Sequence, residues 1–344
     1  MIAQGKRIVD FEHPWLGLES FTEQTKQFFY GRNQEIRDLF LRVRENPLTI
    51  LCGQSGLGKS SLLGAGLIPK LRIEGYRPYL LRLDFEQNEN SLVQQTLEAF
   101  DATLAGAGEQ VGAVATHWMD PGKTLWENLH REPNPIPQLR QSPPVLIFDQ
   151  FEEIFTLART GQRQTEAEEL LRQLADFVEN RPPFELQERF RADPALKRGY
   201  DWNASPVRIV IALRDDYLSY LQAWKNVMPS VMRNQMALHL LTGPQALEAV
   251  VQPGRLGERE LVDEEVGARI VRFVAKRPPT TPLAEIEAVP PLVSLMCDEL
   301  NNARLAAAES TITARRGAEQ SADILQSFYH QSCDGLPPGV RKFV

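Results

Sequence analysis

The residues of this chain that could do chemistry on a phosphate form one continuous stretch. They follow an apolar run at residues 48–52 and read Gly53, Gln54, Ser55, Gly56, Leu57, Gly58, Lys59 and Ser60. Glycines in such a loop allow backbone angles that a Cβ would forbid, so that consecutive amides can point inward around an anion. A helix that begins near Lys59 would add its free N–H groups and its dipole. The spacing G-x-x-x-x-G-K-S between a strand and a helix predicts a P-loop, also called a Walker A motif.

This loop fixes the expected ligand as a nucleoside triphosphate, ATP or its product ADP, with Mg²⁺. Lys59 is expected to reach the β- and γ-phosphates, and the Ser60 hydroxyl is expected to ligate Mg²⁺. We include Ser61, the next residue, among the predicted nucleotide-binding residues. The alternative interpretation is a chance glycine-rich turn, which the strand before the loop and the helix after it disfavour.

A second group of candidate residues follows another apolar run, at residues 143–148. Asp149 ends this run, and Glu152 and Glu153 follow within one turn. In phosphoryl transfer one carboxylate holds the metal shell and another can orient or activate water. The pattern predicts Asp149, the Walker B position, as a metal ligand and either Glu152 or Glu153 as the water-activating residue. The alternative is a helix N-terminus in which these acids only offset the macrodipole.

Arg214 is a third candidate, because it directly follows the apolar run at residues 207–213. An arginine at the carboxyl end of a strand lies at the edge of the sheet where ligands collect in open α/β folds. We therefore expect Arg214 to sense the γ-phosphate or to stabilise charge in the transition state. A salt bridge to Asp215 or Asp216 is the alternative.

Strands that alternate with helices must position these side chains. Periodicity predicts strands at residues 48–52, 79–84, 143–149, 207–213 and 236–241, and helices at residues 33–45, 60–72, 91–104, 124–131 and 166–179. This alternation predicts a three-layer α/β fold in which helices cover both faces of a parallel five-stranded sheet. Roughly ninety residues and one additional strand separate Lys59 from Asp149. That separation fits P-loop proteins with a strand inserted between the P-loop and Walker B strands, and argues against small nucleotide kinases.

The pattern changes near residue 242. Only helical periodicity follows, at residues 244–251, 263–276, 290–309 and 321–332. The expected domains are an N-terminal lead-in at 1–32, a P-loop NTPase domain at 33–242 and an all-α lid domain at 243–344. The last ten residues look like the start of a further amphipathic helix, so the chain looks truncated there.

Composition limits the class of protein. Hydrophobic residues make up 42%, charged residues 24%, and the net charge is −7. These values are ordinary for a globular protein and give no electrostatic indication of nucleic-acid binding. Cys52, Cys297 and Cys333 are too widely spaced for a disulfide framework or a metal site. Without a signal peptide or an apolar run of transmembrane length, the expected location is the cytoplasm.

Beyond single motifs, the chain resembles the STAND class of signal-transduction NTPases, which are relatives of the AAA+ ATPases. The closest group is the bacterial novel STAND NTPases. The resemblance rests on the P-loop and on residues 17–21, 29–36, 148–155 and 213–217. After the P-loop, the run Asp149-Gln150-Phe151-Glu152-Glu153 is its most specific part.

The resemblance implies a molecular switch. In such proteins ADP holds a closed monomer, and ligand sensing elsewhere in the chain allows exchange for ATP, opening and oligomerisation. Attached effector domains are thereby brought together, and slow ATP hydrolysis resets the state. Members are often found beside WD repeats or in antiviral defence. The sensor, the effector and a winged-helix domain would lie outside this chain.

The resemblance also adds two site residues. Arg32, in a Gly-Arg turn, is placed near the adenine pocket, with a surface salt bridge at the start of a helix as the alternative. Pro291 matches the proline of a Gly-x-Pro element that contacts the nucleotide. Val289 replaces the glycine of that element here, and a proline that opens a helix is the alternative.

Two other functions remain open at this stage. One is an AAA+ motor or loader ATPase that acts on nucleic acid, although the chain is acidic and has no basic strip interleaved with aromatic residues. The other is a nucleotide-binding interaction module without useful turnover.

Overall fold

The computed structural model describes residues 9–85, 89–105, 119–132, 141–156, 162–203, 205–258 and 260–313. The chain divides into two compact units. The sheet unit comprises Gln34–Ser55 and Leu67–Leu238, and the helical unit comprises Met1–Asn33, Gly56–Gly66 and His239–Val344. The predicted helix at residues 321–332, the truncated end and Cys333 lie outside the described residues.

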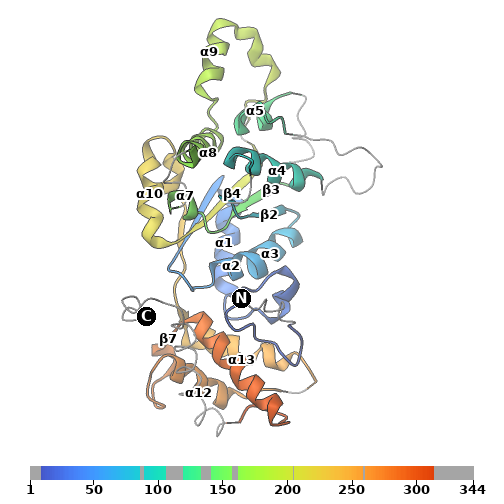
Figure 1. The fold of residues 1–344 in the computed structure, drawn as a ribbon, viewed down its shortest axis with the longest axis vertical. Helices are drawn as coiled ribbons and strands as arrows, with labels where there is room; N and C mark the ends of the chain where they lie inside the picture. The colour runs from blue at the N-terminus through green and yellow to red at the C-terminus, as the bar shows by residue number, and fades with distance from the viewer. Residues whose placement is uncertain are drawn as a thin grey trace. The chain divides into compact units, whose positions relative to one another are not determined.

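A parallel five-stranded sheet forms the centre of the sheet unit (Figure 1). Its strands are β1 (Leu48–Cys52), β2 (Arg77–Leu81), β3 (Pro144–Phe148), β4 (Arg208–Leu213) and β5 (Gln235–Ala237). Their order is β2-β3-β4-β1-β5. β4 lies between the P-loop strand β1 and the Walker B strand β3, although it follows both in the sequence. The α/β P-loop NTPase fold with an inserted strand is therefore confirmed.

Helices cover both faces of this sheet, with α4 and α8 on one side and α1 and α3 on the other (Figure 1). The longer helices of the unit are α1 (Asn33–Glu45), α3 (Ile68–Ile73), α4 (Leu92–Ala105), α5 (Leu125–His130), α8 (Gln162–Val178) and α9 (Phe184–Ala192). Short helical segments are α7 (Glu153–Thr156), η4 (Pro194–Gly199), η5 (Asp215–Tyr217), α10 (Leu218–Gln222), η6 (Ala223–Asn226) and η7 (Pro229–Met232).

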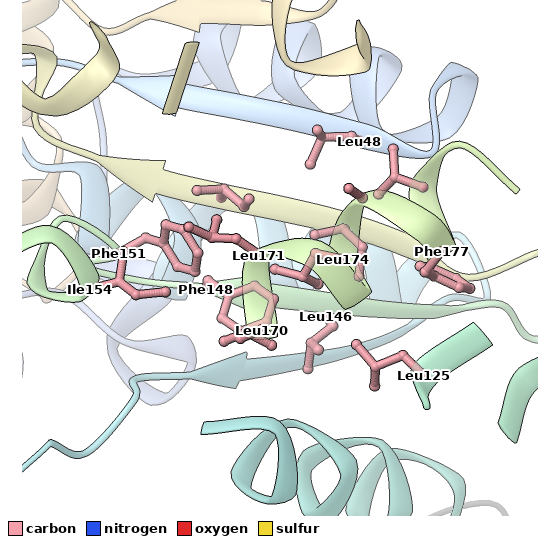
Figure 2. Packing of buried hydrophobic residues seen from close by; sticks show 14 of the residues in the cluster. Leu48, Leu125, Leu146, Phe148, Phe151, Ile154, Leu170, Leu171, Leu174 and Phe177 are labelled. Atoms are coloured by element: carbon pink, nitrogen blue, oxygen red, sulfur yellow. The ribbon is translucent and has the colours of Figure 1, made fainter. Parts of the chain in front are cut away.

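The core of this unit follows from the alternation of side chains along its strands. Every residue of β1 and of β3 is buried, because helices pack on both faces. Figure 2 shows one of these faces, where Leu170 and Leu174 of α8 lie close to Leu146 and Phe148 of β3. This apolar packing fixes the strands whose carboxyl ends carry the candidate site.

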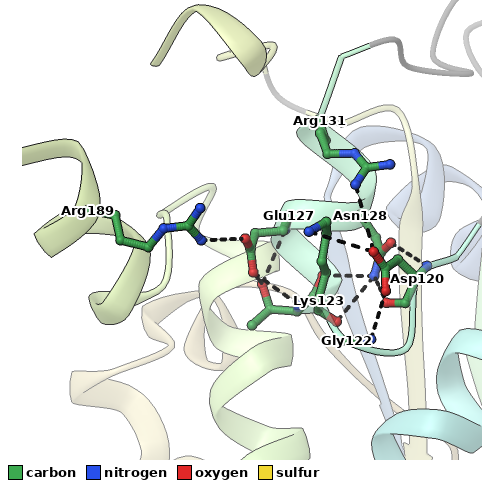
Figure 3. A network of polar contacts seen from close by, with 8 residues as sticks. Asp120, Gly122, Lys123, Glu127, Asn128, Arg131 and Arg189 are labelled. Atoms are coloured by element: carbon green, nitrogen blue, oxygen red, sulfur yellow. Dashed lines mark hydrogen bonds and ion pairs between the residues drawn. The ribbon is translucent and has the colours of Figure 1, made fainter. Parts of the chain in front are cut away.

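A polar network fixes the position of α5. Thr124 and Glu127 form a capping box at the start of the helix, and Glu127 also forms an ion pair of 3.7 Å with Arg189 of α9 (Figure 3). The Asn128 amide donates to the main-chain oxygen of Asp120 over 3.0 Å, and the Asp120 carboxylate lies 3.8 Å from Arg131. The ion pair between Glu127 and Arg189 joins α5 to α9, a helix that the sequence analysis did not predict.

Most predicted strands and helices of the sheet unit are confirmed within a few residues, and β1 and α1 have the predicted bounds. The second strand was expected at residues 79–84, but β2 ends at Leu81 because its partner β3 ends at Phe148. The predicted helix at residues 60–72 is interrupted by a six-residue π-helical segment, Leu62–Leu67. The helical stretch begins as α2 (Lys59–Ser61), and after the π-helical segment it continues as α3.

The helical unit is built on α11 (Gly243–Val251), α12 (Glu264–Val274) and α13 (Pro290–Ala306), with η1 (Glu23–Phe28), η8 (Pro253–Arg255) and η9 (Leu283–Glu285) as short additions. The prediction of purely helical structure after residue 242 is wrong in one detail. Strand β7 (Glu287–Ala288) pairs antiparallel with β6 (Leu241–Thr242). Two residues are too short to give a periodic signal, which is why the sequence did not reveal this strand.

The N-terminal lead-in is part of this unit rather than a separate extension. Trp15 is 3% exposed and belongs to the same apolar cluster as Val250, Val271 and Met296. No helix in the described part of the chain is long and apolar enough to cross a membrane.

Candidate active site

The strand register brings three predicted site residues of the sheet unit to one edge. Cys52 of β1 pairs with Leu213 of β4, and Phe148 of β3 pairs with Ile211 of β4. Gly53, Asp149 and Arg214 each follow directly on one of these strands, at their carboxyl ends. Ligands collect at this edge in open α/β sheets.

Main-chain hydrogen bonds tie the turn at Asp149, directly after β3, to the strands on either side of β3. Its N–H donates to Leu81 O of β2 over 2.9 Å, and the N–H of Phe151 donates to Ala212 O of β4 over 2.9 Å. Between them, Gln150 has a φ of 56°, in the left-handed region that non-glycine residues seldom adopt. Such a conformation is kept only where the surroundings enforce it, and it is concentrated at functional sites.

The two glutamates that follow have different partners. Glu152 Oε2 accepts a hydrogen bond of 3.3 Å from the Arg214 N–H at the end of β4. Glu153 instead forms an ion pair of 2.5 Å with Arg82. Glu152 is thereby directed toward the strand end that also carries the predicted γ-phosphate sensor, and Glu153 toward the β2 side.

Arg214 is held by its neighbours in this structure. Its guanidinium forms an ion pair with Asp216 and lies 5.6 Å from the centroid of the Tyr217 ring. Hydrogen bonding with Asp215 is the main cause that lowers the pKa of Asp216, and the main-chain N–H of Asp216 and the Arg214 guanidinium lower it further. The salt bridge considered as an alternative for Arg214 is present, with Asp216 as its partner.

The P-loop is divided between the two units, because Gly53, Gln54 and Ser55 belong to the sheet unit and the residues from Gly56 onward to the helical unit. Gly56 and Gly58 have φ values of 80° and 88°, as the anion-nest interpretation requires. Gly53 is an exception, because its φ is not positive. The N–H of Leu62 donates to Gly58 O over 2.8 Å, which starts the helix at Lys59 and Ser60 as predicted.

Two residues singled out by the family resemblance lie against the P-loop within the helical unit. Arg32 is 4% exposed, and its Nη2 donates to Leu57 O over 3.2 Å and to His239 O over 2.7 Å. Pro291 Cγ lies 3.5 Å from the position that a Cβ on Gly56 would occupy. The predicted adenine contact of Arg32 and nucleotide contact of Pro291 stay predictions, and Arg32 has the further role of holding a P-loop carbonyl.

The two predicted metal ligands are oxygen donors, the type of ligand that Mg²⁺ takes. The described residues contain no group of three or more His, Cys, Asp or Glu side chains that could hold an ion. Mg²⁺ does not need such a group, because it usually takes one or two protein oxygens together with water and substrate phosphates. The predicted ligands, the Ser60 hydroxyl and the Asp149 carboxylate, are oxygen donors of that kind.

Residues 14–288 match the family model described as Novel STAND NTPase 1. The chain belongs to this family. Membership implies nucleotide binding, usually with Mg²⁺.

Solved structures share the fold at low sequence identity. The Walker-type ATPase PABY2304 of Pyrococcus abyssi superposes with a TM-score of 0.53 at 15% identity, over 92% of this chain and 77% of that one. The structure of Drosophila ORC bound to DNA gives 0.50 at 15% identity, over 90% of this chain and 65% of that one. At these identities the likeness extends to the fold alone.

One curated relative shares a short stretch of sequence. The phosphate import ATP-binding protein PstB 1 of Synechocystis sp. is 37% identical over 60 residues, which is 16% of this chain and 22% of that protein. The match therefore spans less than a quarter of the relative's length.

Three features of the site residues were not predicted from the sequence. Arg82, which engages Glu153, follows β2 and carries no motif. Ser61 was expected to bind nucleotide, but its hydroxyl also accepts the Phe21 N–H over 3.1 Å. The left-handed conformation of Gln150, which directly follows the Walker B aspartate, was not predicted from the sequence.

Proposed function

We propose that this member of the novel STAND NTPase family is a switch that binds ATP or ADP and hydrolyses ATP slowly. The observation that carries this proposal is the hydrogen bond from the Arg214 N–H to Glu152 Oε2. It joins an acid next to the Walker B aspartate to the end of β4. A site in which a water-activating acid contacts the residue that senses phosphate can respond to hydrolysis.

We assign the following roles at the site. The residues from Gly53 to Ser61 would bind the phosphates, with Lys59 at the β- and γ-phosphates. Ser60 and Asp149 would hold Mg²⁺, which neutralises phosphate charge when bound. Glu152 would take a proton from water as the water oxygen attacks the γ-phosphorus and the bond to the bridging oxygen breaks, giving ADP and phosphate. Arg214 would leave Asp216 to meet the γ-phosphate.

The regulatory part of the proposal follows the family resemblance. We propose that residues 33–242 carry the nucleotide chemistry and that residues 243–344 respond to it, with Pro291 and Arg32 contacting the P-loop or its ligand. ADP would favour a closed monomer, and ATP would favour opening and self-association. Sensor and effector parts outside this chain would supply the signal and the output, in bacterial defence within the cytoplasm.

Mass spectrometry of the nucleotide released from purified protein tests the first step, and we expect ADP. Light scattering with ATP and with ADP tests self-association, which we expect only with ATP. Lys59→Ala should abolish both nucleotide retention and ATP-dependent association, whereas Lys70→Ala, in α3 and paired with Glu74, should keep both. Nucleotide retention by Lys59→Ala would refute the P-loop assignment.

A second candidate function is a loader ATPase that acts on nucleic acid, which the fold shared with the DNA-bound ORC structure favours. It would require DNA affinity that falls steeply as salt rises, because phosphate contacts release counterions. The net charge of −7 weighs against it. DNA binding that is unmeasurable at low salt would exclude this candidate.

A further inference from the structure

The N-terminal segment lies directly against the first turn of the helix that follows the P-loop. The Phe21 N–H donates to Ser61 Oγ over 3.1 Å, although the two residues are 40 positions apart in the sequence. Both residues belong to the helical unit, and Ser61 is only 8% exposed. Because buried polar groups need a partner, this bond holds the Ser61 hydroxyl and the main chain of Phe21 together.

Gly64 shows that the main chain of the N-terminal segment also packs closely on this helix. A Cβ on Gly64 would lie 3.0 Å from Phe21 O and 3.5 Å from Thr22 Cα. Gly64 follows Ser61 by three residues, a spacing that places both on one side of a helix. Its backbone is not left-handed, so the missing side chain serves the contact and not the local conformation. The glycine therefore leaves room for the main chain of residues 21 and 22.

Local contacts hold residues 21 and 22 in a defined turn. The Thr22 N–H donates to Thr25 Oγ1 over 2.8 Å, and the Thr25 N–H donates to Thr22 O over 3.0 Å, at the start of η1. The Phe21 ring packs on the Phe29 ring with 5.5 Å between centroids. A turn with its own hydrogen bonds, and not an extended chain end, therefore contacts the P-loop helix.

Ser61 connects this turn to the candidate nucleotide site. A serine hydroxyl has one donor and two acceptor positions, so the bond from Phe21 leaves its proton available to a phosphate. We propose that the turn at residues 21–22 positions Ser61 for nucleotide binding, and that bound nucleotide in return holds this turn on the P-loop helix. The proposal rests on the nucleotide-binding role proposed above and adds a regulatory contact to it. Because coupling between two binding events is reciprocal, a change that loosens the turn must also weaken nucleotide binding.

Hydrogen exchange of the full chain with and without ADP tests this coupling. In the wild type, saturating ADP should slow exchange at residues 16–28 at least about fivefold, the lower end of usual coupling. Gly64→Ala places a methyl group against the main chain of Phe21, although alanine itself favours a helix over glycine. It should speed exchange at residues 16–28 and weaken ADP binding, measured by isothermal titration, at least about fivefold. Gly199→Ala is the matched control, because no atom lies within 4 Å of its Cβ position, and both measurements should equal those of the wild type.

A second variant keeps the test valid if Gly64→Ala disturbs the whole helical unit, which faster exchange in α12 would reveal. Ser61→Ala removes the acceptor without added bulk, so it should speed exchange at residues 16–28 without nucleotide, and ADP should no longer slow it. Equal exchange in Ser61→Ala and the wild type would overturn the proposal. Wild-type exchange at residues 16–28 that bound ADP leaves unchanged would also overturn it, while the P-loop assignment stands. A wild type that binds no ADP would overturn this proposal together with the proposed function.

Discussion

At the scale of single residues, Glu152 and Glu153 illustrate how adjacent acids acquire different tasks. Glu152 accepts a hydrogen bond from the main chain of β4, which holds its carboxylate at the edge where a phosphate would react. Glu153 is paired with Arg82, whose side chain is 60% exposed, and such exposed ion pairs contribute little. We therefore expect the first acid, rather than the second, to act on the water that attacks the phosphate.

Substitution of each glutamate by glutamine should separate these tasks. Glu152→Gln should slow ATP hydrolysis by about 10²- to 10⁴-fold, the usual contribution of a general base, without weakening ATP binding. Glu153→Gln is the matched control and should change turnover by less than about threefold, since it removes only an exposed pair. Phosphate release in a single turnover measures both variants. A larger defect in Glu153→Gln than in Glu152→Gln would reverse the assignment.

His130 is a titratable residue that the candidate site does not use. It is completely buried and stacks on Trp126 with 4.2 Å between ring centroids, and its Nδ1 lies 2.8 Å from Trp126 O. Burial is the main cause that lowers the pKa of His130 below its ordinary value of 6.5. The imidazole is therefore neutral in the folded protein at pH values where it is already protonated in the unfolded chain.

The free energy of unfolding should consequently fall as the pH drops below 6.5. In that range the unfolded state binds a proton that the folded state excludes, with a slope of at most about 1.4 kcal/mol per pH unit. Above the ordinary pKa the contribution should be constant. Urea unfolding of the wild type and of His130→Phe, from about pH 5 to about pH 8, measures it. The difference between the two profiles should be constant above pH 7 and should change as the pH falls below 6.5, and parallel profiles throughout would contradict this assignment.

At the scale of elements, the turn before α1 depends on a glycine. Gly31 has a φ of 84°, and a Cβ placed on it would lie 2.4 Å from Gln245 O of α11. Both residues belong to the helical unit. Gly75 offers a natural comparison, because its φ of 83° is almost the same while no atom lies within 4 Å of its Cβ position.

Alanine at these two glycines should separate backbone strain from steric crowding. Gly75→Ala should cost about 1 kcal/mol, from the left-handed backbone alone. Gly31→Ala should cost about 3 kcal/mol or more, since a backbone carbonyl cannot move aside as a flexible side chain would. Urea unfolding followed by circular dichroism gives both values. Equal losses in the two variants would mean that α11 yields easily to the new methyl group.

Elements with a strong local signal were predictable from the sequence, and those set by pairing were not. β1 is a fully buried apolar run, and the apolar face of α1 recurs with helical spacing, so both were predicted at their bounds. The end of β2 depends on where β3 stops, and β7 exists only through its pairing with β6. A sequence does not display such dependence on a partner.

The candidate site divides in the same way. Asp149, Arg214 and the loop that carries Lys59 directly follow apolar runs, so these runs alone predicted that they lie at the carboxyl ends of strands. The choice between Glu152 and Glu153 required side-chain contacts, because the two acids are adjacent in the sequence and both follow Asp149 within one turn. The Arg32 contact with Leu57 O joins residues 25 positions apart, and no local pattern signals it.

At the scale of the whole molecule, the N-terminal segment packs into the helical unit and contributes to its core. Arg304, whose side chain is 4% exposed, pairs with Glu12 at 3.0 Å, and the Asn301 amide donates to Glu12 O over 2.6 Å. Trp15 Cη2 lies 3.3 Å from the position of a Cβ on Gly254. Residues nearly 300 positions away in the sequence therefore hold this segment in place. We expect its removal to destabilise the helical unit.

Trp15→Ala should therefore destabilise the helical unit by about 3 to 5 kcal/mol, the usual cost of removing a large buried side chain. Leu18→Ala is the control, because Leu18 is 55% exposed and three residues away, and surface substitutions change stability by about 0.5 kcal/mol at most. Amide hydrogen exchange reports on each unit separately. Trp15→Ala should speed exchange in α11, α12 and α13 and leave β1, β3 and β4 protected. Unchanged exchange in the three helices would show that the segment rests on this unit without stabilising it. Faster exchange in the strands as well would show that the two units unfold together.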